Sequence, residues 1–234
     1  MLFRSEEWWA PNGKSRPLPR FNPVRLGFIR HTAARHFERD PMALRPFGGL
    51  RLLDIGCGGG LLSEPLARMG FTVLGADASE KNVAIAAAHA EGSGLDLHYL
   101  ATTAEALASE GARFDIVLNM EVVEHVADVT GFIGACAKLV APGGLTIVAT
   151  LNKTMKSLAL AKLGAEYVLR WLPRGTHDWN RFIKPLDLKA ALERSGLHVT
   201  GLQGIAFDVA RWDWKLSSDT DVNYMIVAEK LKHS

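Results

Sequence analysis

The chain has 234 residues, of which 48% are hydrophobic and 22% are charged, and its formal net charge is +2 at pH 7. This composition excludes a disordered or fibrous chain, and so small a charge gives no reason to expect a nucleic-acid partner. No apolar run approaches the roughly 20 residues that a membrane-spanning helix needs. Two cysteines, Cys57 and Cys136, are too few for a disulfide framework or a zinc site, and they favour a reducing, cytoplasmic environment.

The first 20 residues combine three prolines with the acidic residues Glu6 and Glu7 and the pair Trp8 and Trp9. The acidic residues and the lack of an apolar core do not fit a secretory signal or a mitochondrial transit peptide, so we expect no targeting peptide. We expect this arm to pack across the finished domain, because two tryptophans left in water would be unusual. A frayed terminus is the alternative.

From residue 50 onward, short apolar runs alternate with helix-like stretches. The pattern predicts strands over residues 50–55, 72–76, 95–100, 114–119 and 145–150, and helices over 61–69, 80–90, 104–109 and 131–140. A Pro-Gly-Gly turn is expected to precede the fifth strand. Such an alternation predicts an α/β fold, with a parallel sheet and helices on both of its faces.

The regularity ends after residue 151, where a long insertion replaces the next strand–helix unit. The insertion holds an apolar, helix-like stretch at residues 158–172 and then a polar loop. A helix over 185–195 and two strands over 197–204 and 222–230 follow, and the two strands are close enough in sequence to pair antiparallel at the sheet edge. Long insertions in compact domains are usually functional.

A glycine cluster at residues 56–60 lies between the first strand and the first helix. Glycines there let the backbone turn sharply and approach a ligand closely. The dinucleotide-binding spacing G-x-G-x-x-G fails, because its last position is Leu61. Asp77 ends the second strand, close to the offset at which an acid holds a ribose in such folds. The alternative for Asp77 is the N-cap of the next helix, where Ser79 would serve equally well.

These features together resemble the S-adenosylmethionine-dependent methyltransferases with a seven-stranded sheet. The resemblance rests on residues 53–60, on Asp77 and on residues 139–144, and it covers residues 48–150. It implies a Rossmann-like, seven-stranded, mostly parallel sheet with helices on both faces and an antiparallel edge strand. It also implies S-adenosyl-L-methionine as the cofactor, which has a ribose but no pyrophosphate, and it leaves NAD as a minor alternative.

Further motifs are similar to the ubiquinone biosynthesis O-methyltransferase family, whose members methylate phenolic hydroxyls on polyprenylated rings. Nearly the whole chain takes part, through residues 8–13, 20–25, 120–126, 164–167, 175–178, 182–185 and 221–225. The resemblance implies a single methyltransferase domain with four parts in chain order. These are an N-terminal arm or lid (1–47), a cofactor-binding core (48–150), an insertion for substrate and membrane (151–185), and a closing helix with strands (186–234).

By the same resemblance, Arg25, Gly56, Asp77 and Met120 bind S-adenosylmethionine. Arg25 would pair with the methionine carboxylate, and Met120 would flank the adenosyl group with soft apolar contact. For Arg25 the alternative is a solvated charge, although the Asn-Pro pair before it suggests a fixed turn. For Met120 the alternative is an ordinary place in the core.

Glu121, Glu124 and His125 form the sharpest polar cluster, because spacings of three and four residues place them on one face if the segment is helical. Two carboxylates and a histidine can hold a divalent cation, and the magnesium dependence of eukaryotic relatives favours Mg²⁺ by resemblance. Glu121 and His125 can instead be catalytic groups, with His125 as the general base for the phenol. A helix start with acids near its positive end is the third interpretation.

His177, Asp178 and Lys184 can line the pocket for the ring, although a loop cap explains His177 and Asp178 equally well. The basic and apolar residues of the insertion suit an interfacial helix on an anionic membrane surface, and a lid over the pocket is the alternative. We therefore expect a cytoplasmic, bacterial-type protein that lies peripherally on the inner membrane. Its expected partners are a polyprenylated phenol or quinol as substrate and other ubiquinone-biosynthesis enzymes.

The expected reaction is a direct displacement, in which a phenolate oxygen attacks the sulfonium methyl group in line and leaves S-adenosylhomocysteine. The pKa of a phenol is about 10, so its ionisation must be assisted by a metal ion or a base. Two other interpretations compete with this one. They are a small-molecule N- or C-methyltransferase of another pathway, and a non-catalytic subunit that binds S-adenosylmethionine or lipid.

Overall fold

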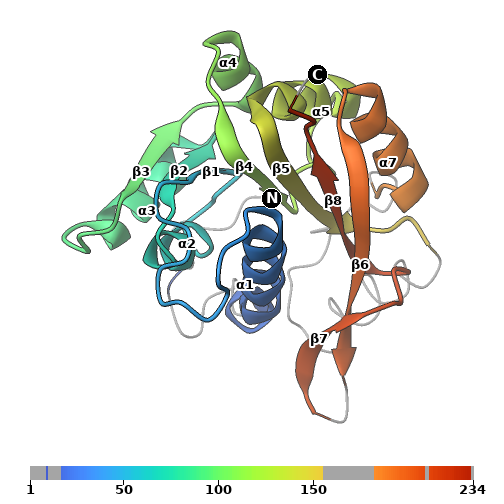
Figure 1. The fold of residues 1–234 in the computed structure, drawn as a ribbon, viewed down its shortest axis with the longest axis horizontal. Coiled ribbons are helices and arrows are strands. Elements are labelled where there is room, and N and C mark those ends of the chain that lie inside the picture. The colour runs from blue at the N-terminus through green and yellow to red at the C-terminus, as the bar shows by residue number, and fades with distance from the viewer. Residues whose placement is uncertain (1–8, 10–16, 155–181, 209–210, 233–234) are drawn as a thin grey trace.

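The structure, a computed structural model, describes residue 9 and residues 17–154, 182–208 and 211–232. Within these ranges eight strands form one sheet in the order β3-β2-β1-β4-β5-β8-β6-β7 (Figure 1). The strands are β1 (Arg51–Ile55), β2 (Thr72–Asp77), β3 (Leu97–Ala101), β4 (Phe114–Met120), β5 (Val140–Leu151), β6 (His198–Asp208), β7 (Asp213–Ser217) and β8 (Asn223–Glu229).

The first five strands in chain order run parallel, and the last three run antiparallel to their neighbours. β8 lies between β5 and β6, where it pairs Val227 with Ile147 and Ile226 with Leu202. The mostly parallel sheet and the antiparallel pair formed by the two closing strands are therefore confirmed. The sequence pattern predicted seven strands and missed β7, because this strand is short and none of its side chains is fully buried.

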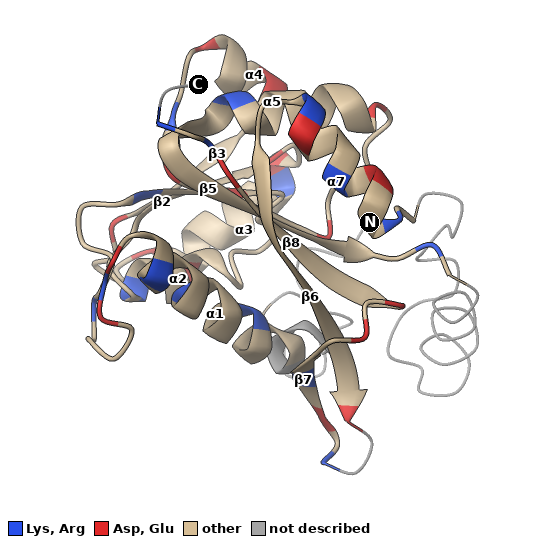
Figure 2. Ribbon diagram, turned by 45° about the vertical axis from the view of Figure 1, so that its right-hand side comes forward, with Lys and Arg blue, Asp and Glu red and all other residues tan. Residues whose placement is uncertain are grey.

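Helices cover both faces of the sheet (Figure 2). One core lies under α1 and α2 around Ile29 and Leu66, and the other lies under α4, α5 and α7 around Ile133 and Leu188. Because both faces are covered, β4 and β8 are nearly continuous runs of buried residues rather than alternating ones. The described helices are α1 (Pro17–His36), α2 (Ser63–Arg68), α3 (Glu80–Ala90), α4 (Ala104–Ser109), α5 (Val129–Leu139) and α7 (Pro185–Arg194).

The N-terminal region differs from the expected arm, because it contains the 20-residue helix α1. Pro23, which we expected in a fixed turn, lies inside this helix. Local propensity did not indicate a helix here, since proline is unfavourable in a helix interior. Burial of Phe21, Ile29 and Ala33 against the sheet stabilises α1 instead, as tertiary packing does for most protein helices.

The start of β5 also differs, because the strand runs through the expected Pro-Gly-Gly turn. A register shift between Phe114 and Ile116 of β4 accommodates the irregularity as a bulge. Gly143 has a φ of +79°, and a Cβ on Gly144 would lie 2.6 Å from the carbonyl oxygen of Asp115. These glycines therefore let β5 approach β4 closely within the strand, instead of forming a separate turn before it.

The apolar stretch expected to be helical at residues 158–172 lies outside the described residues. Within the described ranges, no helix is long and apolar enough to cross a membrane. The next described helix, α7, begins with Pro185 in its first turn, as the sequence predicts.

Candidate active site

The expected cofactor-binding residues gather at the carboxyl ends of three parallel strands. The glycine loop (residues 56–60) follows β1, Asp77 ends β2 and Met120 ends β4. β1 has β2 on one side and β4 on the other, so the strand order reverses at this point of the sheet. Ligands of open α/β sheets bind in the crevice at such a reversal. Arg25 of α1 joins these residues through its ion pair with Glu121, which directly follows β4.

The glycine loop is held in place by hydrogen bonds from its own backbone. The N–H groups of Gly56 and Cys57 donate to the carbonyl of Ala76 at 2.7 and 3.1 Å, and the N–H of Gly58 donates to Asp77 at 3.0 Å. Gly56 has a φ of +72°, and a Cβ there would overlap the side chain of Val122. Only glycine combines a favourable positive φ with the absence of a Cβ. The backbone at this position can therefore be approached closely by the side chain of Val122.

Asp77 is a half-buried carboxylate that organises the turn after β2. Besides the N–H of Gly58, it accepts hydrogen bonds from the N–H of Ser79 at 2.8 Å and the side-chain amide of Asn82 at 3.2 Å. The N-cap of α3 is Ser79, whose hydroxyl accepts from the N–H of Asn82. The alternative role of Asp77 as the cap is therefore not realised, and its carboxylate joins the glycine loop to β2.

Arg25 is buried, with 2% of its surface exposed, and it forms an ion pair with Glu121. The guanidinium carbon also lies 3.9 Å from the ring centroid of Phe21. Burial lowers the pKa of Arg25, and the nearby carboxylates of Glu121, Glu124 and Asp54 oppose this shift. The alternative of a solvated charge is thus wrong. The Nε atom of Arg25 has no hydrogen-bond partner among the described residues, so the guanidinium keeps a donor to offer.

The segment from Glu121 to His125 is a turn and not the helix considered for it, since the N–H of His125 donates to the carbonyl of Val122 at 2.8 Å. Glu121 has a φ of +60°, a left-handed conformation that costs energy for a residue with a side chain. In the described part of the chain, no three His, Cys, Asp or Glu side chains are arranged to hold a metal ion. The expected metal site of Glu121, Glu124 and His125 is therefore not formed.

Glu124 is almost completely buried, with 3% of its surface exposed. Its Oε2 accepts a hydrogen bond from the Thr150 hydroxyl at 2.8 Å, whereas its Oε1 has no partner among the described residues. Burial raises the pKa of Glu124 well above its ordinary value, and the charge of Glu121 raises it further. Glu124 is therefore held toward its neutral, protonated form.

Asp54 is a site residue that the motif contains but to which sequence reasoning gave no role. It is the last residue but one of β1, with 2% of its surface exposed, and accepts a hydrogen bond from the Ser63 hydroxyl at 2.6 Å. Burial raises the pKa of Asp54 to about 6; the charge of Asp77 adds to this shift, whereas Ser63 and Arg25 oppose it. An acid between the apolar residues Leu53 and Ile55 of a predicted buried strand was the available signal.

Four predicted residues remain, and of these Met120 lies at the end of β4 with the cluster just described. Met120 is 7% exposed and packs in the core beneath α1, which fits the alternative of ordinary core as well as a place beside the cofactor. Lys184 is exposed just before α7, while His177 and Asp178 lie outside the described residues. Burial raises the pKa of the Cys57 thiol, which agrees with a reaction whose nucleophile comes from the substrate and not from a cysteine.

Solved structures of methyltransferases share this fold. The magnesium protoporphyrin IX methyltransferase of Synechocystis PCC 6803, with bound SAH, is 24% identical and has a TM-score of 0.57 over 88% of this chain and 84% of its own. An S-adenosylmethionine-dependent methyltransferase of Clostridium acetobutylicum ATCC 824 is 12% identical, with a TM-score of 0.63 over 88% and 90%. A family model described as a methyltransferase domain matches residues 27–202. The family model therefore defines the chain as a methyltransferase, and its fold is the one seen in S-adenosylmethionine-dependent methyltransferases.

Relatives of high sequence identity show to which family of methyltransferases the chain belongs. A protein of Sinorhizobium fredii named ubiquinone biosynthesis O-methyltransferase is 61% identical over 224 residues, which are 96% of this chain and 90% of that protein. A protein of the same name from Caulobacter sp. K31 is 60% identical over 225 residues, which are 96% and 89% of the two chains. The chain belongs to the ubiquinone biosynthesis O-methyltransferase family, and the resemblance seen in its sequence is confirmed.

Proposed function

We propose that this chain transfers the methyl group of S-adenosylmethionine to a phenolic hydroxyl on a polyprenylated ring. The reactions are of the type that converts 3-demethylubiquinol to ubiquinol or methylates 2-polyprenyl-6-hydroxyphenol. The names of the close relatives support the reaction and the pathway. One structural observation carries the cofactor assignment, namely the meeting of Asp77 and the glycine loop at the reversal of strand order.

The charges around this crevice suit the cofactor. S-adenosylmethionine carries a sulfonium, an ammonium and one carboxylate, and Asp54, Asp77 and Glu121 supply more negative charge than Arg25 neutralises. Methyl transfer removes the sulfonium charge, so these acids hold the product less tightly than the substrate.

Each part of the cofactor has a matching group in the site. The half-buried carboxylate of Asp77 already accepts three hydrogen bonds and can accept one more, from a ribose hydroxyl. The backbone of Gly56, which carries no side chain, would lie against the methionine part. Arg25 uses one nitrogen for Glu121 and can offer its Nε–H to the methionine carboxylate. Met120 would lie against the adenosyl group.

The acceptor side of the reaction is assigned to the turn after β4. A neutral imidazole is the usual general base near pH 7, and His125 is half-buried at the end of this turn. In this proposal His125 accepts the proton of the phenolic hydroxyl that is methylated. The Glu121 carboxylate accepts a hydrogen bond from another hydroxyl of the ring and so aligns the substrate. Since Glu121, Glu124 and His125 as placed do not fit a magnesium ion, these steps rest on side chains alone.

The substrate and its location complete the proposal. A polyprenyl chain stays in the bilayer, so the insertion at 151–185 would lie on an anionic membrane surface, with His177, Asp178 and Lys184 near the ring. The chain would thus act at the cytoplasmic side of the inner membrane, beside other enzymes of ubiquinone biosynthesis. Sedimentation with anionic vesicles tests this part: the wild type should bind, and Lys153→Glu with Lys156→Glu should bind less.

The reaction itself is tested with purified protein, S-adenosylmethionine carrying a labelled methyl group and a short-chain demethylated quinol. Mass spectrometry should find labelled O-methylated quinol and S-adenosylhomocysteine in equal amounts. Calorimetry on the same sample reports whether the cofactor binds. Bound cofactor without methylated quinol would contradict the substrate assignment and leave the cofactor site standing.

A further inference from the structure

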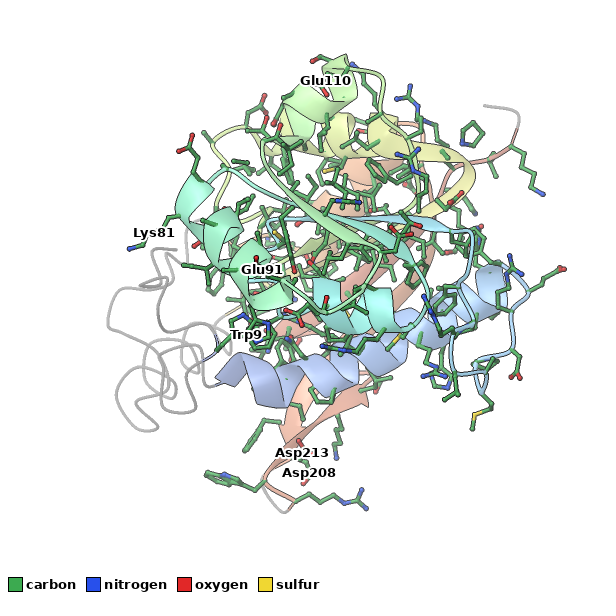
Figure 3. The ribbon with its side chains drawn as sticks, turned by 90° about the vertical axis from the view of Figure 1, so that its left-hand side faces the viewer. Trp9, Lys81, Glu91, Glu110, Asp208 and Asp213 are labelled. Carbon is green, nitrogen blue, oxygen red and sulfur yellow. The ribbon has the colours of Figure 1, made fainter. Side chains whose placement is uncertain are left out.

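Trp9 contacts the glycine loop, although it is 50 residues away from Gly59 in sequence. Its indole N–H donates a hydrogen bond to the carbonyl of Gly59 at 2.9 Å. The indole also stacks on the imidazole of His89, with ring centroids 3.5 Å apart and planes 2° from parallel. Figure 3 shows Trp9 beside the end of α3, where Glu91 is labelled. The expectation that the arm packs on the domain is confirmed for Trp9, while Trp8 lies outside the described residues.

His89 is itself fixed by a buried acid. Its Nδ1 is hydrogen-bonded to Glu64, whose side chain is 1% exposed and also accepts from Arg68 at 3.1 Å. A carboxylate buried this deeply needs such partners, so the position of the imidazole is well determined. The N–H of Glu64 donates in addition to the carbonyl of Gly60 at 3.2 Å. Trp9, His89 and Glu64 together form what we call the outer brace of the loop.

The outer brace and Asp77 hold the loop from two sides. The carbonyls of Gly59 and Gly60 accept hydrogen bonds from Trp9 and Glu64 of the brace, and the N–H of Gly58 donates to Asp77. A run of glycines has the greatest backbone freedom of any sequence, and that freedom must be lost when a ligand is bound. A loop that is already held in one conformation loses less entropy on binding and therefore binds more tightly.

We propose that Trp9 is a positioning residue for the cofactor loop, which the outer brace holds ready for S-adenosylmethionine. Affinity for the cofactor then depends on the contacts that Trp9 makes with Gly59 and His89. By reciprocity, bound cofactor stabilises the docking of Trp9 on the loop. This inference rests on the cofactor assignment of the proposed function, but it does not depend on which acceptor is methylated.

The test is calorimetric titration of S-adenosylmethionine into full-length variants, without an acceptor. Trp9→Phe keeps an aromatic ring for His89 but has no N–H for Gly59, and should bind about 2- to 10-fold more weakly, the loss of one hydrogen bond. Trp9→Ala should bind more weakly still. With saturating cofactor, kcat and the KM for the quinol should stay within about twofold of wild type. Trp212→Phe, at an exposed indole just before β7, is the matched control and should bind like the wild type.

A double-mutant cycle separates the outer brace from a general effect on stability. Because Trp9 and His89 act as one unit, His89→Ala with Trp9→Ala should bind no more weakly than the weaker single variant. Wild-type affinity in both Trp9 variants, or additive effects in the cycle, would overturn the proposal. If Trp9→Ala does not fold, Trp9→Phe still decides the question. A wild type that binds the cofactor but does not methylate the quinol would contradict the proposed substrate and leave this inference intact.

Discussion

The glycine loop and the turn at residues 121–125 lie at neighbouring strand ends, yet they are built in opposite ways. In the loop, positive φ angles fall on glycines, and the surrounding hydrogen bonds hold its backbone on both sides. In the turn, the left-handed residue is Glu121, and the buried Glu124 keeps one oxygen without a partner in the described structure.

This contrast assigns different tasks to the two segments. A loop whose backbone is held by hydrogen bonds on both sides is suited to holding a ligand in one position. Backbone strain, a buried acid and a shifted pKa are features that cluster where chemistry takes place. We therefore assign cofactor binding to the loop and activation of the acceptor to the turn.

The largest expected effect is on turnover, from a change in the turn. His125→Gln keeps a polar side chain but cannot take up a proton at neutral pH, so kcat should fall by about 10²- to 10⁴-fold. Cofactor affinity measured by calorimetry should be unchanged. His98→Gln, at an exposed position of β3, is the control and should leave both quantities unchanged. A normal kcat for His125→Gln would show that His125 is not the general base.

The next effect is on stability, where the loop meets the turn. Gly56→Ala places a Cβ against Val122 at a φ of +72°, so the free energy of unfolding should fall by about 2–5 kcal/mol. Gly94→Ala imposes a similar φ of +67° with open space around it and should cost only about 1–2 kcal/mol. Chemical denaturation gives the free energy of unfolding of both variants. The difference between their losses measures the effect of the contact between Gly56 and Val122. Equal losses would show that Val122 does not constrain the loop.

Asp54 gives a pH dependence with a definite sign. Burial raises its pKa to about 6 in the folded chain, so the folded state keeps a proton that the unfolded state has lost. The free energy of unfolding should therefore fall as the pH rises from about 4 to about 6. Asp54→Asn should remove this part of the fall, up to about 3 kcal/mol, and be more stable than the wild type at pH 7. Parallel pH profiles of the two proteins would contradict the assignment.

A smaller effect is expected on cofactor affinity alone. Asp77→Ala loses a charge-assisted hydrogen bond to the ribose and the hydrogen bond that holds Gly58, and should weaken binding by about 1–3 kcal/mol in calorimetry. Asp96→Ala removes an equal charge from an exposed position before β3 and should bind like the wild type. Unchanged affinity in Asp77→Ala would defeat its role at the ribose.

The same contrast explains which parts could be predicted from sequence. The glycine loop, Asp77 and the strands that carry them are encoded locally, by turn residues and apolar runs, and the expected boundaries of α3 and α4 match the structure. The turn at 121–125 could not be predicted, because its i, i+3 and i+4 spacing is also that of a helix. The roles of Asp54 and of the helix α1 depend on burial against distant residues, which no local pattern reveals.

A double-mutant cycle between Asp77 and His125 tests the division of tasks most directly. Each variant and the pair are compared by kcat/KM for the quinol at a fixed, subsaturating concentration of S-adenosylmethionine. If the loop binds the cofactor and the turn activates the acceptor, the two changes should add within about 0.5 kcal/mol. A coupling well beyond that value would contradict the separation and show that the two segments act on the same group.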